Sequence, residues 1–305
     1  MPLAVMLRSV DSHLDPDLRL DVHVADDGLD APSRARVERS LSARVRLRWW
    51  PARWEALGAL PTWGRMPLTT YLKLSLAEWL PSDVGRAVWL DCDLVMRASL
   101  ARLWREELGA SPLGAIVDRR VPRLGSRFGV AGHRELGLDG ELPYFNAGVM
   151  VCDLAAWRAS EVARRALGYI QRYGNRIVFQ DQEALNAVFA GRWRSLDPRW
   201  NWDPTLDAVL GRLRPAAAAE LHEPWIVHFA GRLKPWRYGA VTEHHQRYFE
   251  ELDATAWAGW RPRISPLRAL AVRYARSPFR RWLYPLEPWS VAIARALSRR
   301  TENRA

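Results

Sequence analysis

Short apolar segments typical of β-strands alternate with segments of helical spacing along the first 260 residues of the chain. This alternation constrains the fold most, because strands separated by helices predict an α/β protein with a mostly parallel sheet. Folds of this class bind their ligands at the carboxyl ends of the strands, where several acids and one histidine of this sequence fall. The predicted strands are 18–26, 44–50, 86–96, 113–118, 143–154 and 223–231, and the predicted helices include 33–43, 67–81, 155–174 and 181–191.

The segment VWLDCDLVM, residues 88–96, places two carboxylates in an apolar run. If the segment is one strand, Asp91 and Asp93 lie on the same face, because side chains alternate along a strand. Two carboxylates that close resist ionising together unless a cation lies between them. Oxygen ligands with open positions suit Mg²⁺ or Mn²⁺, which commonly hold a substrate phosphate as well. From this motif alone, two solvated acids at a strand end are an equally good interpretation.

His228 lies at the end of another predicted strand, after the apolar residues WIV. A single histidine in such a place is more often a structural residue than a ligand. It becomes a third ligand if the fold brings it to Asp91 and Asp93, and an imidazole beside two carboxylates favours Mn²⁺ over Mg²⁺.

Most of the net charge of +11 lies in a C-terminal segment, residues 261–305, which holds eleven arginines and two glutamates. A basic tail argues against a nucleic-acid-binding protein, whose basic residues more often form a stripe on a folded face. In a helix, Trp289 and Ile293 would lie opposite Arg295 and Arg299. Such a segment is typical of helices that bind anionic membranes, and a solvated tail is the alternative.

No run of about 18 apolar residues occurs, so we expect no membrane-spanning helix. The N-terminus lacks the features of a secretory signal. Cys92 and Cys152 both lie in apolar runs, so we expect buried thiols in a reducing compartment rather than a disulfide. With the basic tail, these features predict a cytoplasmic protein that is peripheral on the inner face of the cell membrane.

Four segments together resemble glycosyltransferase family 8, which includes glycogenin-like proteins and bacterial lipopolysaccharide galactosyl- and glucosyltransferases. The segments are VWLDCDLVM (88–96), PYFNAGVMVCDLAAWR (143–158), FQDQEALN (179–186) and HFAGRLKPW (228–236). The resemblance covers roughly residues 65–240. It implies the GT-A fold, a Rossmann-like nucleotide-binding domain, for residues 1–260, with 261–305 as a separate basic tail.

The resemblance also implies a binding site for a UDP-sugar. Asp91, Asp93 and His228 would bind Mn²⁺, with Mg²⁺ as the alternative, and the ion would offset the charge that develops on the departing UDP. Lys234 would contact the diphosphate, and Gly231 would let the backbone approach it. The remaining donor-binding residues would be Lys73, which lies where the family commonly has arginine, Asp118 and Asn146.

Asp181 and Gln182 match the catalytic residues of the family, which retains the anomeric configuration of the sugar. Gln182 is neutral and a poor nucleophile, so we favour attack by the acceptor from the face that UDP leaves. Asp181 would position donor hydroxyls, the Gln182 amide would stabilise the oxocarbenium-like centre, and the leaving phosphate would take the acceptor's proton. A sugar adduct trapped on Asp181 or Glu183 would overturn this mechanism. Taken alone, Asp181 is better explained as a charge favoured by a helix N-terminus.

One feature departs from the family pattern. Chains of the family begin with a strand that contacts uracil and ribose, whereas this sequence opens with a segment that looks like the following helix. We therefore expect the first strand of the sheet to be lacking, which would leave strand edges unpaired.

The predicted activity is transfer of a hexose, galactose or glucose, from a UDP-sugar to a glycolipid or surface oligosaccharide such as lipopolysaccharide. The alternative is a non-catalytic homologue that binds a sugar or a partner. A phosphatase of the haloacid-dehalogenase type also has D-x-D after an apolar strand, but it would leave the other three segments unexplained.

Overall fold

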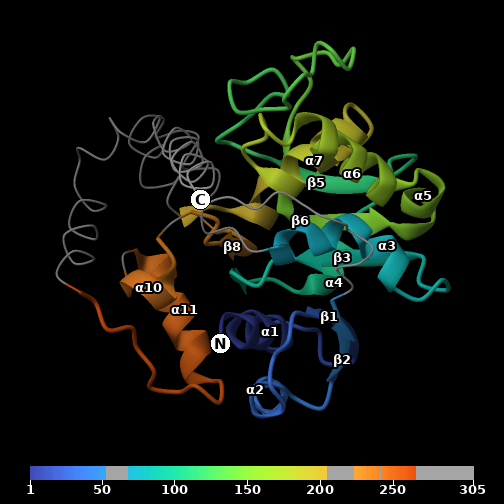
Figure 1. The fold of residues 1–305 in the computed structure, drawn as a ribbon. Coiled ribbons are helices and arrows are strands. Elements are labelled where there is room, and N and C mark those ends of the chain that lie inside the picture. Colours follow the sequence, from blue (N-terminus) through green and yellow to red (C-terminus); the bar gives the residue numbers. More distant parts are fainter. Residues whose placement is uncertain (53–67, 205–222, 232, 241, 266–305) are drawn as a thin grey trace, which may run out of the picture.

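The computed structural model describes residues 1–52, 68–204, 223–231, 233–240 and 242–265 (Figure 1). Its strands are β1 (Leu20–Asp26), β2 (Val45–Pro51), β3 (Arg86–Leu90), β4 (Leu94–Met96), β5 (Leu113–Val117), β6 (Phe145–Asp153), β7 (Arg194–Ser195) and β8 (Ile226–His228). Its α-helices are α1 (Pro2–Ser12), α2 (Ala31–Glu38), α3 (Leu76–Trp79), α4 (Leu100–Trp104), α5 (Leu154–Ala159), α6 (Val162–Tyr173), α7 (Gln180–Phe189), α10 (Pro235–Tyr238) and α11 (Glu243–Asp253), and two 3₁₀ helices are η2 (Leu68–Ser75) and η3 (Pro198–Asn201).

The described strands form three groups: β1–β2, β3–β6–β5–β7 and β4–β8. The prediction of a mostly parallel sheet is wrong for them, because β6 runs antiparallel to both β3 and β5, and β4 runs antiparallel to β8. Only β1–β2 and β5–β7 among the described pairs are parallel. For the β5–β6 pair the reason is their connection, residues 118–144, which forms a long hairpin loop instead of a helical crossover and returns the chain beside Val117.

Strand β6, inside the four-stranded sheet, is buried on both faces. Met150 and Cys152 of β6 belong to a core shared with α5, α6 and α7, whereas Val149 and Val151 belong to a second core shared with α1 and β4. Figure 1 shows α6 and α7 on one side of β5 and α1, β1 and β2 on the opposite side of the sheet. Strand β6 therefore lies at the centre of the domain, between the two cores.

Local sequence sets the helix ends. Pro2 occupies the first turn of α1, where its missing NH costs no hydrogen bond. Asp30 caps α2 by accepting from the Ser33 backbone NH at 2.8 Å. Asp153 ends β6 and caps α5 through the Ala156 NH at 2.9 Å. The change from strand to helix in the segment VMVCDLAAW is thus fixed by one carboxylate.

The pairs β1–β2 and β3–β6 belong to separate sheets. In the described chain β1 pairs with β2 alone, and β3 pairs with β6 alone. Leu20 and Val22 of β1 and Val88 and Leu90 of β3 are half-buried and pack against the same core. The expectation that the family's first strand is lacking stays a prediction, and these two strand edges are where it would apply.

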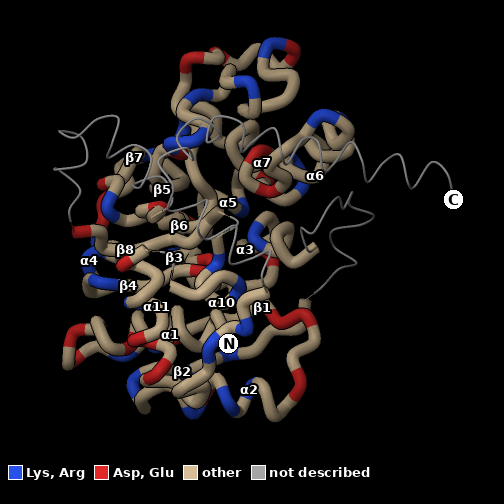
Figure 2. Tube along the Cα trace, turned by 90° about the vertical axis from the view of Figure 1, so that its left-hand side faces the viewer, with Lys and Arg blue, Asp and Glu red and all other residues tan. Residues whose placement is uncertain are grey.

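The two cysteines differ in their environment. Cys152 is buried in β6, as expected, but Cys92 is exposed, because the acids on either side of it face inward at a turn. Both are free thiols. Within the described residues no helix is both long and apolar enough to cross a membrane. The predicted basic tail lies outside the described residues from position 266 onward, and basic and acidic residues are interspersed over the rest (Figure 2).

Candidate active site

The predicted donor-binding residues gather at one edge of the four-stranded sheet. Asp91 follows β3 and donates its backbone NH to the Gly148 carbonyl at 2.9 Å, and Asp118 follows β5 and donates its NH to the Tyr144 carbonyl at 2.8 Å. Asn146 is the second residue of β6. Because β6 is antiparallel to both neighbours, it begins where they end. The strand directions therefore bring Asp91, Asp118 and Asn146 together.

Asp91 and Asp93 lie in a turn, which corrects the prediction that residues 86–96 form one strand. The chain leaves β3 at Leu90 and enters a separate pairing with β8 at Leu94. The three residues between the strands belong to neither sheet. A turn can accommodate two charged side chains with one exposed residue between them. In a strand with both faces buried, the two carboxylates would lose their contact with water, which is costly for charged groups.

The turn lies beside His228. Leu94 pairs with His228 in the β4–β8 ladder, and His228 Nε2 is 3.3 Å from Asp93 Oδ1. One ligand atom from each of Asp91, Asp93 and His228 lies within 4.8 Å of the others. The hypothesis that the fold brings His228 to the two acids is confirmed. The ring packs directly on the backbone of β6, since a Cβ at Gly148 would be 2.2 Å from His228 Cε1.

The donor set fits a divalent cation. Two carboxylates and one imidazole are the ligands that Mn²⁺ and Mg²⁺ accept, with remaining positions left for a substrate phosphate. His228 is 3% exposed, and the Gly148 backbone forms a cradle that a larger residue would fill. The ring is thereby held with its edge toward the acids.

The chain contains two lysines, and both lie at this cluster. Lys73 Nζ is 3.1 Å from Asp91 Oδ1 and 3.0 Å from Asp181 Oδ2. Lys234 forms an ion pair with Asp93 Oδ2. Each acid of the D-x-D segment is therefore neutralised on one oxygen by its own ammonium group, and Lys73 also links the cluster to α7.

The ion pairs control the protonation of the site. Burial alone would raise the pKa of the Asp93 carboxyl, but His228, when its ring is protonated, and Lys234 hold that pKa well below its ordinary value. Burial would likewise lower the pKa of Lys73, yet Asp181 and Asp91 raise it above the ordinary value for lysine. Burial raises the pKa of Asp181, and Lys73 opposes that shift. Lys73 is therefore charged throughout the physiological range.

Asp118, Asn146 and Gln182 form one hydrogen-bonded group. Asn146 Nδ2 and Gln182 Nε2 both donate to Asp118 Oδ2, at 3.1 and 3.0 Å. Gln182 Oε1 accepts from the Ala147 backbone NH at 3.1 Å. Asp181 and Gln182 both belong to the first turn of α7. Each predicted catalytic residue thus contacts a predicted donor-binding residue directly: Asp181 forms an ion pair with Lys73, and Gln182 forms a hydrogen bond with Asp118.

Glu183, the next acid of α7, has a structural environment. Its carboxylate accepts from the Tyr169 hydroxyl at 2.8 Å and from the backbone NH groups of Ala131 and Val178 at 2.9 and 2.8 Å. The residue is 1% exposed. These contacts hold the long loop after β5 against α6 and α7. They also occupy both carboxylate oxygens of Glu183, which is buried.

Gly231 lies three residues after His228, on the segment that leads to Lys234. It is partly exposed, and its role in approaching a diphosphate stays a prediction.

Two residues of the site were not predicted. Asn201, at the end of η3, lies with its Oδ1 2.7 Å from His228 Nδ1. Trp89 donates its indole NH to Asp91 Oδ1 at 2.8 Å. Trp89 belongs to an apolar strand and carries no sequence signal for such a contact.

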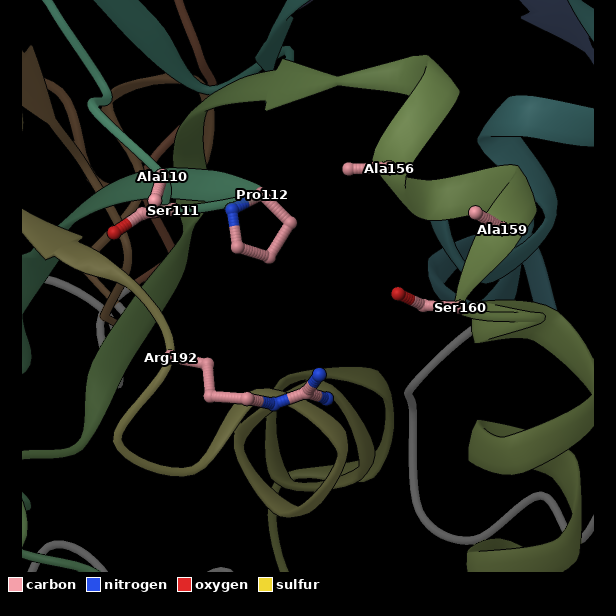
Figure 3. A pocket seen from close by; sticks show the side chains of 7 residues that line it. All are labelled: Ala110, Ser111, Pro112, Ala156, Ala159, Ser160 and Arg192. Carbon is pink, nitrogen blue, oxygen red and sulfur yellow. The ribbon is translucent and has the colours of Figure 1, made fainter.

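A cavity of about 430 Å³ lies elsewhere, between the start of β5 and α5. Figure 3 shows the side chain of Arg192 and the Ser160 hydroxyl at this cavity. None of the predicted site residues lines it, so it is distinct from the cation cluster. The other residues lining it are Ala110, Ser111, Pro112, Ala156 and Ala159.

Comparison with known proteins agrees with this geometry. Residues 1–240 match the sequence profile described as Glycosyl transferase family 8. The chain is 24% identical over 267 residues to General stress protein A of Bacillus subtilis (strain 168), covering 84% of this chain and 90% of that protein. It is 23% identical over 256 residues to the lipopolysaccharide 1,2-glucosyltransferase of Escherichia coli (strain K12), covering 82% and 72%.

Among solved structures, the galactosyltransferase LgtC in complex with donor and acceptor sugar analogs superimposes with a TM-score of 0.71 at 27% identity. The superposition covers 83% of this chain and 91% of that one. The fold is therefore the α/β, GT-A-like fold. With the family profile matching most of its length, the chain belongs to glycosyltransferase family 8 and is an enzyme of this retaining family.

Proposed function

We propose that the enzyme transfers a hexose, galactose or glucose, from a UDP-sugar to a glycolipid or surface oligosaccharide such as lipopolysaccharide, in a reaction that depends on Mn²⁺. The observation that carries the proposal is the cluster of Asp91, Asp93 and His228 with a lysine on each acid. Likeness to an enzyme solved with donor and acceptor sugar analogs supports the substrate class.

In this proposal Asp91, Asp93 and His228 would hold Mn²⁺, with Mg²⁺ as the alternative, and the bound ion would supply positive charge to the departing diphosphate. Lys234 reaches Asp93 Oδ2 and the Phe229 carbonyl from the start of α10. Its ammonium would turn to a diphosphate oxygen when a cation neutralises Asp93. Gly231 would approach the same group through its backbone.

The donor sugar would lie against Asp118, Asn146 and Lys73. Lys73 and Asp181 are paired and buried, so Asp181 would keep a fixed orientation toward the donor hydroxyls. The Gln182 amide is anchored at its oxygen by the Ala147 NH, which fixes its nitrogen toward the site. Same-face attack on the sugar remains our mechanism, since Gln182 is neutral and Glu183 is enclosed by its own hydrogen bonds.

We also propose that residues 261–305 associate with an anionic membrane surface and place the enzyme on the cytoplasmic face of the cell membrane. The support is compositional, namely the interleaved arginines and apolar residues of this segment. No nucleic-acid partner is proposed.

The test is a screen of UDP-sugars for Mn²⁺-dependent hydrolysis by the full chain. We expect release of UDP from UDP-galactose or UDP-glucose, lost in EDTA and in Asp93→Asn. Absence of UDP release from both donors in the presence of Mn²⁺ would contradict the proposal.

A further inference from the structure

A continuous series of side-chain hydrogen bonds links His228 to Gln182. His228 Nδ1 is 2.7 Å from Asn201 Oδ1, and Asn201 Nδ2 donates to Asn146 Oδ1 at 2.9 Å. Asn146 Nδ2 donates to Asp118 Oδ2, which also accepts from Gln182 Nε2. One amide, Asn201, therefore joins the cation ligand to the donor-sugar group.

The direction of every bond in the series is fixed by a backbone group. The Gly148 NH donates to Asn146 at 2.9 Å, and a backbone NH can only donate, so the atom that it meets is Oδ1. The Asn201 atom that faces this oxygen must then be the amide nitrogen. Consequently the oxygen of Asn201 faces His228.

This orientation decides the tautomer of His228. An amide oxygen accepts, so Nδ1 of the ring must carry a proton. In a neutral ring the lone pair then lies on Nε2, the atom that faces Asp93 Oδ1 at 3.3 Å. A metal ligand needs that lone pair, and the hydrogen bond on the other ring nitrogen sets where it is.

We propose that Asn201 is a positioning residue that holds His228 in the Nδ1–H tautomer, with Nε2 free for a divalent cation, and that couples this ligand to the Asn146–Asp118–Gln182 group. The coupling deepens the proposed function and rests on it, whereas the tautomer can be measured without any sugar. The Gly148 backbone does two things for the ring: its NH orients the amides, and its missing Cβ leaves room for His228.

Two variants separate the two halves of the proposal. Asn201→Ala removes both the acceptor for His228 and the donor for Asn146. Asn201→Asp keeps an oxygen toward His228 but cannot donate to Asn146. Asn175→Ala, at an exposed asparagine after α6, is the matched control.

The measurements are made on the full chain labelled with ¹⁵N-histidine, metal-free and at a pH where the ring is neutral, with His228→Gln used for assignment. Ring nitrogen shifts report which atom is protonated, and the free Mn²⁺ signal in electron paramagnetic resonance gives the dissociation constant. We expect a protonated Nδ1 in the parent, in Asn175→Ala and in Asn201→Asp. In Asn201→Ala we expect loss of that preference and Mn²⁺ binding weakened about 10-fold or more.

Asn201→Asp should bind Mn²⁺ at least as tightly as the parent yet hydrolyse UDP-sugar more slowly, because its contact to Asn146 is lost. The proposal is overturned if Asn201→Ala matches Asn175→Ala in both tautomer and Mn²⁺ affinity. If Asn201→Ala does not fold, an unprotonated Nδ1 in Asn201→Asp overturns it instead. A shifted tautomer in a protein that hydrolyses no UDP-sugar would uphold the role of Asn201 and reject the proposed function.

Discussion

Replacing Lys73 with methionine removes the ammonium group that lies between Asp91 and Asp181 while keeping a long side chain in its place. Lys73 is 4% exposed, and its Nζ also donates to the Ala147 carbonyl at 3.2 Å. Removing one partner of a buried ion pair leaves an uncompensated charge and costs about 3–5 kcal/mol of unfolding free energy. Because the Asp91 side chain is 30% exposed and stays partly solvated, we expect the lower end, about 3 kcal/mol.

The same variant should change how stability depends on pH. In the parent, the raised pKa of Lys73 contributes stability below the ordinary lysine pKa, which is lost only in strong alkali. Lys73→Met removes the charge that most strongly opposes the effect of burial, which raises the pKa of Asp181. A carboxyl with a raised folded pKa binds more protons in the folded state, so stability falls as pH rises through that value. The variant should therefore recover part of its lost stability as the pH is lowered from neutral to mildly acidic, through the raised pKa of Asp181.

Urea unfolding followed by tryptophan fluorescence at neutral and mildly acidic pH measures these effects. Lys73→Arg, which keeps the charge, is the control and should lose much less stability. A Lys73→Met protein within about 0.5 kcal/mol of the parent at neutral pH would refute the reasoning, since surface substitutions alone cause changes of that size.

Three further predictions follow from the site and the tail. Asp93→Asn should reduce Mn²⁺-dependent UDP-sugar hydrolysis by at least about 100-fold, measured as UDP release, because a bound cation supplies several kcal/mol of transition-state stabilisation; unchanged turnover would exclude this acid as a ligand. Gly148→Ala should cost about 1–3 kcal/mol in urea unfolding and weaken Mn²⁺ binding, because its Cβ would meet the His228 ring. The control is Gly168→Ala in α6, whose Cβ meets nothing within 4 Å and which should be neutral or stabilising. An equal loss of unfolding free energy in both variants would contradict the close packing of His228 against Gly148. Deletion of residues 262–305 should abolish sedimentation with anionic vesicles and spare hydrolysis, and equal vesicle binding by the shortened chain would reject the membrane role.

The sequence predicted the types of most elements because periodicity and end signals are local properties. The strands at 18–26, 44–50 and 113–118 were found within a few residues. Strand direction was not predictable in the same way. Whether β6 runs parallel or antiparallel to β5 depends on the path of the 118–144 connection, which has no periodic pattern.

The cation cluster was predicted from residue chemistry, but its detailed support was not. Asp91, Asp93 and His228 carry a recognisable ligand pattern, whereas Asn201 gains its role from a contact with a histidine 27 positions away. Cys92 was expected to be buried because apolar residues surround it in sequence. The turn between β3 and β4 instead points the two acids inward and leaves Cys92 an exposed residue. Such roles depend on which side of a turn faces the core, and no local pattern encodes that.

The most direct test of the proposed cation site is an anomalous difference map from crystals of the full chain grown with UDP and Mn²⁺. We expect one strong manganese peak within coordination distance of the Asp91 and Asp93 carboxylates and His228 Nε2, in contact with the diphosphate. A diphosphate bound by Lys234 with no manganese at these three side chains, or a manganese peak elsewhere, would contradict the proposal.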